Sequence, residues 1–332
     1  MTFHANGKLL LTGEYFVLDG ALALALPVRL GQSLECQFVE NEGSLTWQSF
    51  DEKGACWFEA VFESESFNCL QSTDPAVAER LQKILREASQ LIQSDRVTSS
   101  HPVTFDFQKT ALVKTRLEFP RAWGLGSSST LIYCIAQWAQ VDAFELQFST
   151  FGGSGYDIAC AGANSPILYQ LKNGQPKFEP CRFEPPFANC LYFIYLGKKQ
   201  DSREGIARYR AAAGIGDSGL GIGQKIVDEI SELTKEFLSA TSLADFEKLI
   251  QEHERLVGET LKLPRAKDLY FNDFWGEIKS LGAWGGDFVL ATSDRPQATT
   301  KAYFHQKGFE VVLPFFDLAL VPGSGTLPGN FS

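Results

Sequence analysis

The chain has 332 residues, of which 44% are hydrophobic and 21% charged, a globular composition long enough for two domains. Its 30 basic and 40 acidic residues give a formal net charge of −10 without any basic run, which argues against a nucleic-acid or anionic-membrane surface. The seven cysteines form no CxxC pair and the four histidines show no metal-ligand spacing, so reduced thiols and a cytoplasmic location are expected. The apolar run 21–27 is too short to cross a membrane.

The first third of the chain is predicted to be mostly β-sheet. Apolar runs at 8–12 and 16–18 flank a tight turn, and Asp19-Gly20 is typical of a hairpin that leads into a strand at 21–26. Alternating hydrophobic residues predict further strands at 33–39, 44–50 and 56–62. Pro75 is then expected to begin an amphipathic helix that reaches at least residue 91, before a strand at 103–107.

The second half is predicted to mix strands and helices. Strands are expected at 165–170 and 189–195, with a domain boundary in the proline-rich segment between them. Helical patterns follow at 203–212, 222–240, 243–260 and near 264–280, and strands return at 288–292, 310–313 and 318–321. This order indicates an α+β second domain, so we predict domains at 1–185 and 186–332, with a loose tail after 323.

The stretch 120–130 combines a glycine turn with the start of a helix. Gly124 and Gly126 precede a run of serines, after which apolar residues recur at helical spacing. A serine at 127 or 128 is expected to cap the first turn. The backbone N–H groups and the positive end of the helix dipole would face an anion, so the stretch is either a phosphate site or an ordinary capped helix.

Two more glycine segments have a related form. The segment 151–157 delivers Asp157 to the first turn of a short helix, and the segment 281–287 leads into a strand. A GxGxxG match at 214–219 follows a basic, helix-like stretch and not a strand, so we interpret it as a flexible loop. The sequence contains no GxxxxGK[ST] pattern, which excludes a P-loop.

Three segments of the chain, in this order, resemble the motifs of the GHMP kinases, the superfamily of galactokinase, homoserine kinase, mevalonate kinase and phosphomevalonate kinase. They are 7–20, which contains Gly13-Glu14-Tyr15, then 124–129, and then 282–287, which closes with an aspartate. The first and third look most like phosphomevalonate kinases, and the Gly-Tyr-Asp-Ile-Ala sequence at 155–159 suggests a bacterial offshoot of that group. The resemblance implies a two-domain α+β fold, with an N-terminal domain like domain 2 of ribosomal protein S5 and a ferredoxin-like C-terminal domain.

The resemblance also implies ATP and Mg²⁺ as cofactors. Phosphoryl transfer depends on charge neutralisation around the γ-phosphate and on a positioned acceptor hydroxyl. Asp157 would accept the hydroxyl proton, while Lys8 would keep that carboxylate ionised and stabilise the transferring group. The backbone expected to hold the nucleotide is that of Gly124, Leu125, Gly126, Ser127, Ser128, Ser129, Gly282, Gly285 and Gly286. Mg²⁺ would be bound by Ser128 and by Glu145, or by Asp142 in its place.

The acceptor is expected to be a small acid or phosphorylated acid. The densest basic cluster of this acidic chain lies between 198 and 210, where a strand ends and a helix begins. It would bind a phosphate or carboxylate, or it is a solvated helix face. The residues expected to contact the acceptor are Glu14, Tyr15, Ser154, Gly155, Lys198, Lys199, Ser202 and Arg203.

The sequence departs from the superfamily pattern in three places. About thirty residues separate the serine run from Asp157, so a helix that supplies a second Mg²⁺-binding carboxylate is shortened or missing. Trp284 stands where a glycine is usual and would narrow the loop near the phosphates, and Ala122 replaces another glycine.

Three functions are compatible with these residues. The favoured one is a mevalonate-pathway kinase acting on phosphomevalonate first and mevalonate second. The others are a diphosphomevalonate decarboxylase-like enzyme and a non-catalytic nucleotide- or metabolite-binding protein. The expected assembly is a monomer or a homodimer, without nucleic-acid or membrane partners.

Overall fold

The computed structural model describes residues 1–38, 43–98, 110–197, 202–212, 223–282, 284 and 286–322. These residues form two compact units that are both discontinuous in sequence. The first unit comprises Met1–Gly7, Leu30–Arg121 and Leu125–Gly162, and the second comprises Lys8–Arg29, Ala122–Gly124 and the chain from Ala163 onward. The predicted boundary between 185 and 186 remains a prediction.

The first unit contains a sheet with the strand order β5-β4-β3-β6-β2. Its strands are β5 (Cys69–Ser72), β4 (Cys56–Glu63), β3 (Ser44–Phe50), β6 (Thr110–Leu117) and the later part of β2 (Ala23–Phe38), with which β1 (Thr2–Leu10) also pairs. β3 runs parallel to β6, whereas the neighbouring pairs β3–β4, β4–β5 and β2–β6 are antiparallel. Side chains of β3 alternate between buried and half-buried, as expected for a sheet covered on one face.

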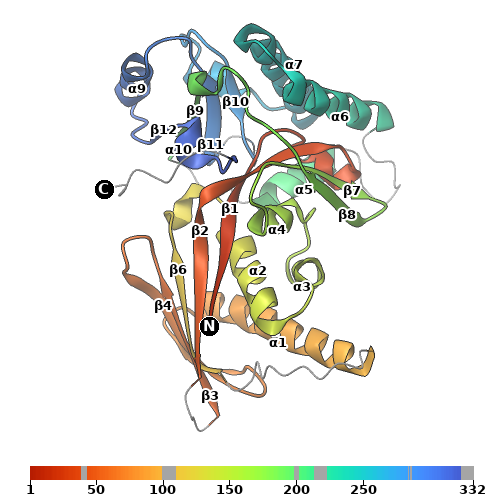
Figure 1. The fold of residues 1–332 in the computed structure, drawn as a ribbon, viewed down its shortest axis with the longest axis vertical. Helices are drawn as coiled ribbons and strands as arrows, with labels where there is room; N and C mark the ends of the chain where they lie inside the picture. Colours follow the sequence, from red (N-terminus) through yellow and green to blue (C-terminus); the bar gives the residue numbers. More distant parts are fainter. Residues whose placement is uncertain are drawn as a thin grey trace. The chain divides into compact units, whose positions relative to one another are not determined.

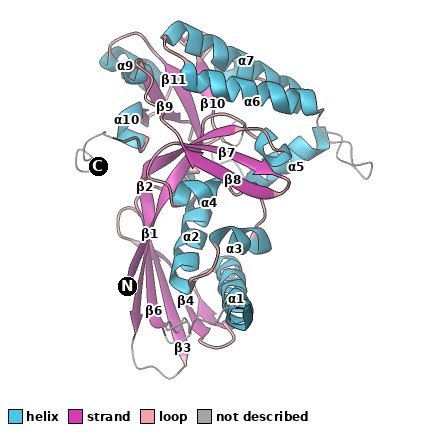
Figure 2. Cartoon of the chain, turned by 45° about the vertical axis from the view of Figure 1, so that its right-hand side comes forward, coloured by secondary structure: helices cyan, strands magenta, loops and turns pink. Residues whose placement is uncertain are grey.

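Helices cover that face of the first unit, as Figure 2 shows. They are α1 (Pro75–Thr98), α2 (Ser127–Ala139), α3 (Ala143–Thr150) and α4 (Tyr156–Ala161). Trp47 of β3 and Trp138 of α2 meet in the core with ring centroids 6.4 Å apart, and Leu85 of α1 is buried in the same cluster. The predicted helix that starts at Pro75 is therefore confirmed, and its apolar stripe is what attaches it to the sheet.

The second unit uses the beginning of β2. Residues Ala23–Ala25 pair with β7 (Ile167–Lys172), which pairs with β8 (Gln175–Pro180). The strands predicted separately at 21–26 and 33–39 are thus one strand of 16 residues. The strand predicted at 16–18 is wrong, because Phe16–Asp19 is a 3₁₀ helix (η1) that buries the consecutive residues Phe16 and Val17, which a half-exposed strand would point to opposite faces.

A second sheet in the same unit has the order β10-β11-β9-β12, with antiparallel neighbours throughout. Its strands are β9 (Leu191–Tyr195), β10 (Ile278–Ser280), β11 (Phe288–Thr292) and β12 (Val312–Pro314). The helices of this unit are α5 (Ser202–Ala212), α6 (Gln224–Ser239), α7 (Leu243–Leu261), α8 (Ala266–Tyr270), α9 (Gln297–Gln306), α10 (Phe315–Leu318) and the 3₁₀ turn η4 (Ala188–Cys190). The amphipathic helices α6 and α7 lie side by side (Figure 1).

Two predicted elements of the second unit are wrong. The helix predicted near 264–280 ends at Tyr270. Phe271, Phe274 and Ile278 keep helical spacing in the sequence, but their side chains fill an aromatic cluster from a non-helical segment that leads into β10. The strand predicted at 318–321 is reduced to an isolated antiparallel bridge between Ala319 and Val28, because α10 extends to Leu318 and buries that side chain together with Phe315.

The observed architecture is a mixed α+β fold with two sheets, as predicted. The seven cysteines all lie among the described residues, and none is paired in a disulfide. None of the described helices is both long and apolar enough to span a bilayer. The predicted strand at 103–107, the loop at 214–219 and the tail after 323 lie outside the described residues.

Candidate active site

In the first unit, the helix that follows the glycine turn begins without a side-chain cap. Gly126 is its N-cap and has φ 94°, a left-handed conformation that favours glycine, and no side chain bonds to the first-turn N–H groups. The predicted serine cap is therefore wrong. Ser129 is buried and its hydroxyl donates back to the Gly126 carbonyl at 2.9 Å, whereas Ser128 is exposed. The start of α2 thus keeps backbone donors that an anion can use.

Helix α4 places Asp157 in its first turn. Gly155 is its N-cap with φ 85°, and Gly152 and Gly153 before it also have positive φ, so the approach to the helix is a turn that only glycines adopt readily. The Asp157 carboxylate is half-buried, and its Oδ1 accepts the Ile158 N–H at 3.2 Å. Ser154, predicted to contact the acceptor, is buried beside this turn.

Helices α2 and α4 of the first unit are in direct contact. A Cβ on Gly162, which ends α4, would lie 2.2 Å from the Tyr133 hydroxyl of α2. Ile158 and Ile132 join the same core cluster. The two helix starts are therefore fixed within one rigidly packed layer.

The structure adds no evidence for the predicted Mg²⁺ ligands, except that their side chains are exposed to solvent. Glu145 lies in the first turn of α3 and is exposed, and Asp142 is the N-cap of that helix, with its Oδ1 accepting the Glu145 N–H at 2.8 Å. No group of three or more His, Cys, Asp or Glu side chains that could hold a metal occurs in the described part of the chain.

In the second unit, residues 122–124 are held by five contacts. Lys8 Nζ donates to the Gly124 carbonyl at 3.0 Å, and the Tyr195 hydroxyl donates to the Ala122 carbonyl at 3.0 Å. The Trp123 ring meets those of Tyr195 and Phe288, with centroids 6.1 and 5.5 Å away. The fifth contact is between Gly124 and Asp287, which lie so close that a Cβ on Gly124 would be 2.1 Å from Asp287 Oδ2.

The third glycine segment also belongs to the second unit. Gly282 has φ 66° and Asp287 has φ 49°, so both ends of the segment use the left-handed region, while Gly285 lies outside the described residues. Trp284 does not narrow the loop as expected. Its side chain is 4% exposed, packs into the core cluster of α6 and α7, and donates from Nε1 to the Pro264 carbonyl at 3.0 Å.

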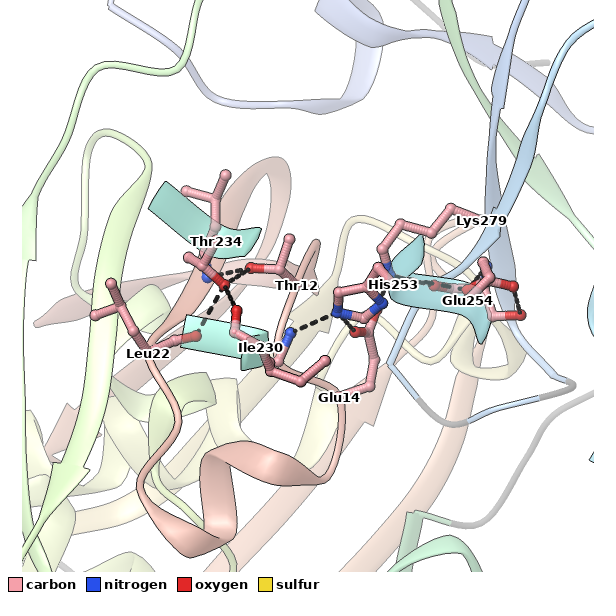
Figure 3. Close-up of polar contacts among 11 residues, drawn as sticks. Thr12, Glu14, Leu22, Ile230, Thr234, His253, Glu254 and Lys279 are labelled. Atoms are coloured by element: carbon pink, nitrogen blue, oxygen red, sulfur yellow. Dashed lines mark hydrogen bonds and ion pairs between the residues drawn. The ribbon is translucent and has the colours of Figure 1, made fainter. Parts of the chain in front are cut away.

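Glu14, predicted to contact the acceptor, is fully buried. Its Oε1 accepts from Lys279 Nζ at 2.5 Å, and its Oε2 lies 3.1 Å from His253 Nε2 (Figure 3). Glu254 completes the group, because it accepts the Ser280 N–H at 3.0 Å and lies 4.0 Å from Lys279. We call Glu14, His253, Glu254 and Lys279 the buried polar cluster. The substrate contact expected of Glu14 remains a prediction, and its carboxylate is bound within this cluster.

Burial shifts the protonation of the buried polar cluster. It raises the pKa of Glu254 to about 8, with a further contribution from the Glu14 charge, and raises that of Glu14 to about 7 against the opposing effect of Lys279. Burial and Lys279 hold the pKa of His253 well below its ordinary value, so the ring is neutral. Its Nε2 accepts the Gly13 N–H at 3.1 Å and lies 3.1 Å from Glu14 Oε2. A proton on Glu14 would remove the repulsion between this lone pair and the carboxylate charge.

Tyr15, also predicted to contact the acceptor, is a core side chain. It is 8% exposed and stacks on Tyr209 of α5 with ring centroids 5.6 Å apart. Its hydroxyl accepts the Trp284 N–H at 2.9 Å. Burial raises the pKa of this phenol, which keeps it neutral.

The predicted basic cluster is only partly described. Lys198 and Lys199 lie outside the described residues, and Ser202 and Arg203 begin α5 without described side chains. Their roles remain proposals. Sequence reasoning missed His253 and Glu254, although a signal existed, because they share the buried face of α7 with Phe246, Ile250 and Val257 at helical spacing.

No family model and no curated protein matches the sequence. Solved structures do match over almost the whole chain. L. major mevalonate kinase in complex with R-mevalonate matches with a TM-score of 0.61 and 16% identity over 98% of this chain and 97% of that one. Streptococcus pneumoniae phosphomevalonate kinase in complex with phosphomevalonate and AMPPNP matches with a TM-score of 0.64 and 15% identity over 94% and 99%.

A sugar kinase matches equally well. Lactococcus lactis galactokinase complexed with galactose gives a TM-score of 0.61 and 12% identity over 96% of this chain and 93% of that one. The chain therefore has the fold shared by these GHMP kinases. At such identities the comparison establishes the fold and does not distinguish one branch from another.

Proposed function

We propose that this protein is an ATP- and Mg²⁺-dependent kinase that phosphorylates a small metabolite, with phosphomevalonate the favoured acceptor and mevalonate the second. The observation that carries the proposal is the uncapped start of α2 at Gly126, in a chain that shares its fold along nearly its full length with three kinases. The S. pneumoniae enzyme of that fold was solved with the ATP analogue AMPPNP.

The described residues suit a nucleotide phosphate. The N–H groups at the start of α2 carry the positive end of a helix of 13 residues, and no side chain occupies them. Lys8 adds a cation to the second unit at the Gly124 carbonyl. ATP with Mg²⁺ would supply the γ-phosphoryl group, with Ser128 as the exposed hydroxyl offered to the metal.

Asp157 is the proposed general base. Its carboxylate is half-buried, and one oxygen accepts the adjacent Ile158 N–H, which orients the side chain at the start of α4. An ionised carboxylate in this position would accept the proton of the acceptor hydroxyl as the phosphorus–oxygen bond forms. Lys8 would stabilise the charge that develops on the transferring group.

An ADP-release assay tests the proposal. Purified protein with MgATP would be offered mevalonate, phosphomevalonate, homoserine or galactose. We expect phosphomevalonate to give the highest kcat/KM, because the basic residues at 198–203 would bind its phosphate. A preference for galactose would overturn the acceptor assignment while leaving the kinase intact, and MgATP binding without ADP release for any of a broad set of acceptors would overturn the kinase itself.

Two substitutions test the proposed catalytic residues. Asp157→Asn and Lys8→Met should each lower kcat at least about a hundredfold, the usual effect of removing a general base or an electrostatic stabiliser. Asp245→Asn is the control for the first, because Asp245 is an exposed acid in the first turn of α7. Lys83→Met is the control for the second, because Lys83 Nζ also donates to a backbone carbonyl, that of Thr150, at 2.6 Å. Near-normal rates in both test variants would refute the assignment.

A further inference from the structure

The turn at Tyr15 has a strained backbone. Tyr15 has φ 61° and ψ −42°, and the Phe16 N–H donates to the Glu14 carbonyl at 2.8 Å, so the three residues form a γ-turn of the positive-φ type. This conformation is rare for a residue with a side chain and costs about 1–3 kcal/mol. Such a cost persists only where surrounding contacts impose the conformation.

The contacts that impose it come from several elements of the second unit. On one side, the Gly13 N–H donates to His253, and Glu14 is bound to Lys279. On the other side, the Tyr15 ring stacks on Tyr209 of α5. Together they fix the direction in which the Tyr15 side chain leaves the turn.

Helix α5 packs directly over the Tyr15 hydroxyl. A Cβ on Gly205 would lie 2.4 Å from this oxygen, so only a glycine allows α5 to lie so close. The hydroxyl in turn accepts the Trp284 N–H at 2.9 Å, a backbone group of the third glycine segment. Trp284 is held on its far side by the bond from its indole to the Pro264 carbonyl.

We propose that Tyr15 is a positioning residue, whose hydroxyl fixes the backbone of the third glycine segment at Trp284 and thereby holds the described glycines Gly282 and Gly286 in place for the nucleotide. The inference rests on the proposed function for the identity of the ligand. The strained turn is the means by which the phenol reaches a backbone donor that lies 269 positions later in the chain. The role is confined to nucleotide binding, because neither the ring nor the hydroxyl is exposed enough to bind an acceptor.

Tyr15→Phe tests the proposal, with Tyr209→Phe as its matched control. The two tyrosines form one stacked pair, and each loses a single buried hydroxyl, but that of Tyr209 donates to Asp19 at 2.5 Å and makes no bond to the glycine segment. We expect Tyr15→Phe to raise the Kd for MgATP and the KM for ATP about fivefold, as the loss of one hydrogen bond predicts, with an unchanged KM for the acceptor. Tyr209→Phe should leave all three constants unchanged.

Amide hydrogen exchange provides a readout that does not depend on activity. In the protein without nucleotide, the peptide that contains Trp284 should exchange about fivefold faster in Tyr15→Phe and at the wild-type rate in Tyr209→Phe. If wild-type protein binds MgATP but both variants bind it equally well and exchange equally, the positioning role is refuted. If wild-type protein binds no MgATP, the proposed function fails. Faster amide exchange at Trp284 that is confined to Tyr15→Phe would still show that the Tyr15 hydroxyl holds this segment in place.

Discussion

Gly124 offers a quantitative test of how the glycine turn is held. An alanine there would keep φ 66°, which costs an L-residue about 1–2 kcal/mol. Its Cβ would also lie 2.1 Å from Oδ2 and 2.2 Å from Cγ of Asp287, far inside van der Waals contact. Asp287 cannot retreat easily, because its own φ is 49° and its carbonyl accepts the Leu196 N–H at 2.8 Å.

Gly282 supplies the matched control. It has the same φ of 66°, but a Cβ there would meet no heavy atom within 4 Å. Gly282→Ala should therefore lower the free energy of unfolding by the backbone cost alone, about 1–2 kcal/mol. Gly124→Ala should lose about 1–3 kcal/mol more, the usual cost of overpacking a tight contact.

Urea unfolding of both variants at 25 °C measures the difference. Equal losses, within about 0.5 kcal/mol, would refute the close contact between Gly124 and Asp287. A second check is Asp287→Gly in the Gly124→Ala background, which removes the clashing carboxylate and should recover most of the additional loss.

Two further predictions concern buried side chains of the second unit. Burial raises the pKa of Glu254 from 4.5 to about 8, so its contribution to stability is complete below pH 4.5 and is lost as the pH rises through 8. The free energy of unfolding of Glu254→Gln should therefore rise relative to that of wild type between pH 5 and pH 8, by a few kcal/mol. If urea unfolding shows the same pH dependence for both proteins, Glu254 is not protonated in the folded state as inferred. Trp284→Gly should cost at least about 3 kcal/mol in the free energy of unfolding without lowering the KM for ATP, because the indole fills the core. A lower KM would show instead that Trp284 obstructs the loop.

Local patterns were sufficient to predict much of the fold. The stripe of apolar residues after Pro75 and the alternation at 44–50 gave α1 and β3 because each element buries one face against a single core. The glycines of the three segments were also informative, since Gly124, Gly126 and Gly155 adopt positive φ, as glycine-rich turns into helices often do.

The roles of Glu14 and Tyr15 could not be predicted in this way. Their partners, Lys279 and Trp284, lie 265 and 269 positions later, and no local pattern reports a pairing at such separation. The serine cap of α2 failed for a related reason, because the backbone geometry of Gly126 and the inward bond of Ser129 are decided by packing and not by propensity.

The buried polar cluster also sets an order of events during synthesis. Glu14 leaves the ribosome early, but Lys279 follows 265 residues later, which at about 5–20 residues per second is a delay of roughly 15–50 s. During this time the nascent N-terminal segment cannot complete its buried ion pair. A chain that stops before α7 would never supply the partner charge of Lys279, so we expect truncated products to expose the segment around Glu14 and to aggregate. During full-length synthesis, we expect residues near Glu14 to need protection until β10 has emerged.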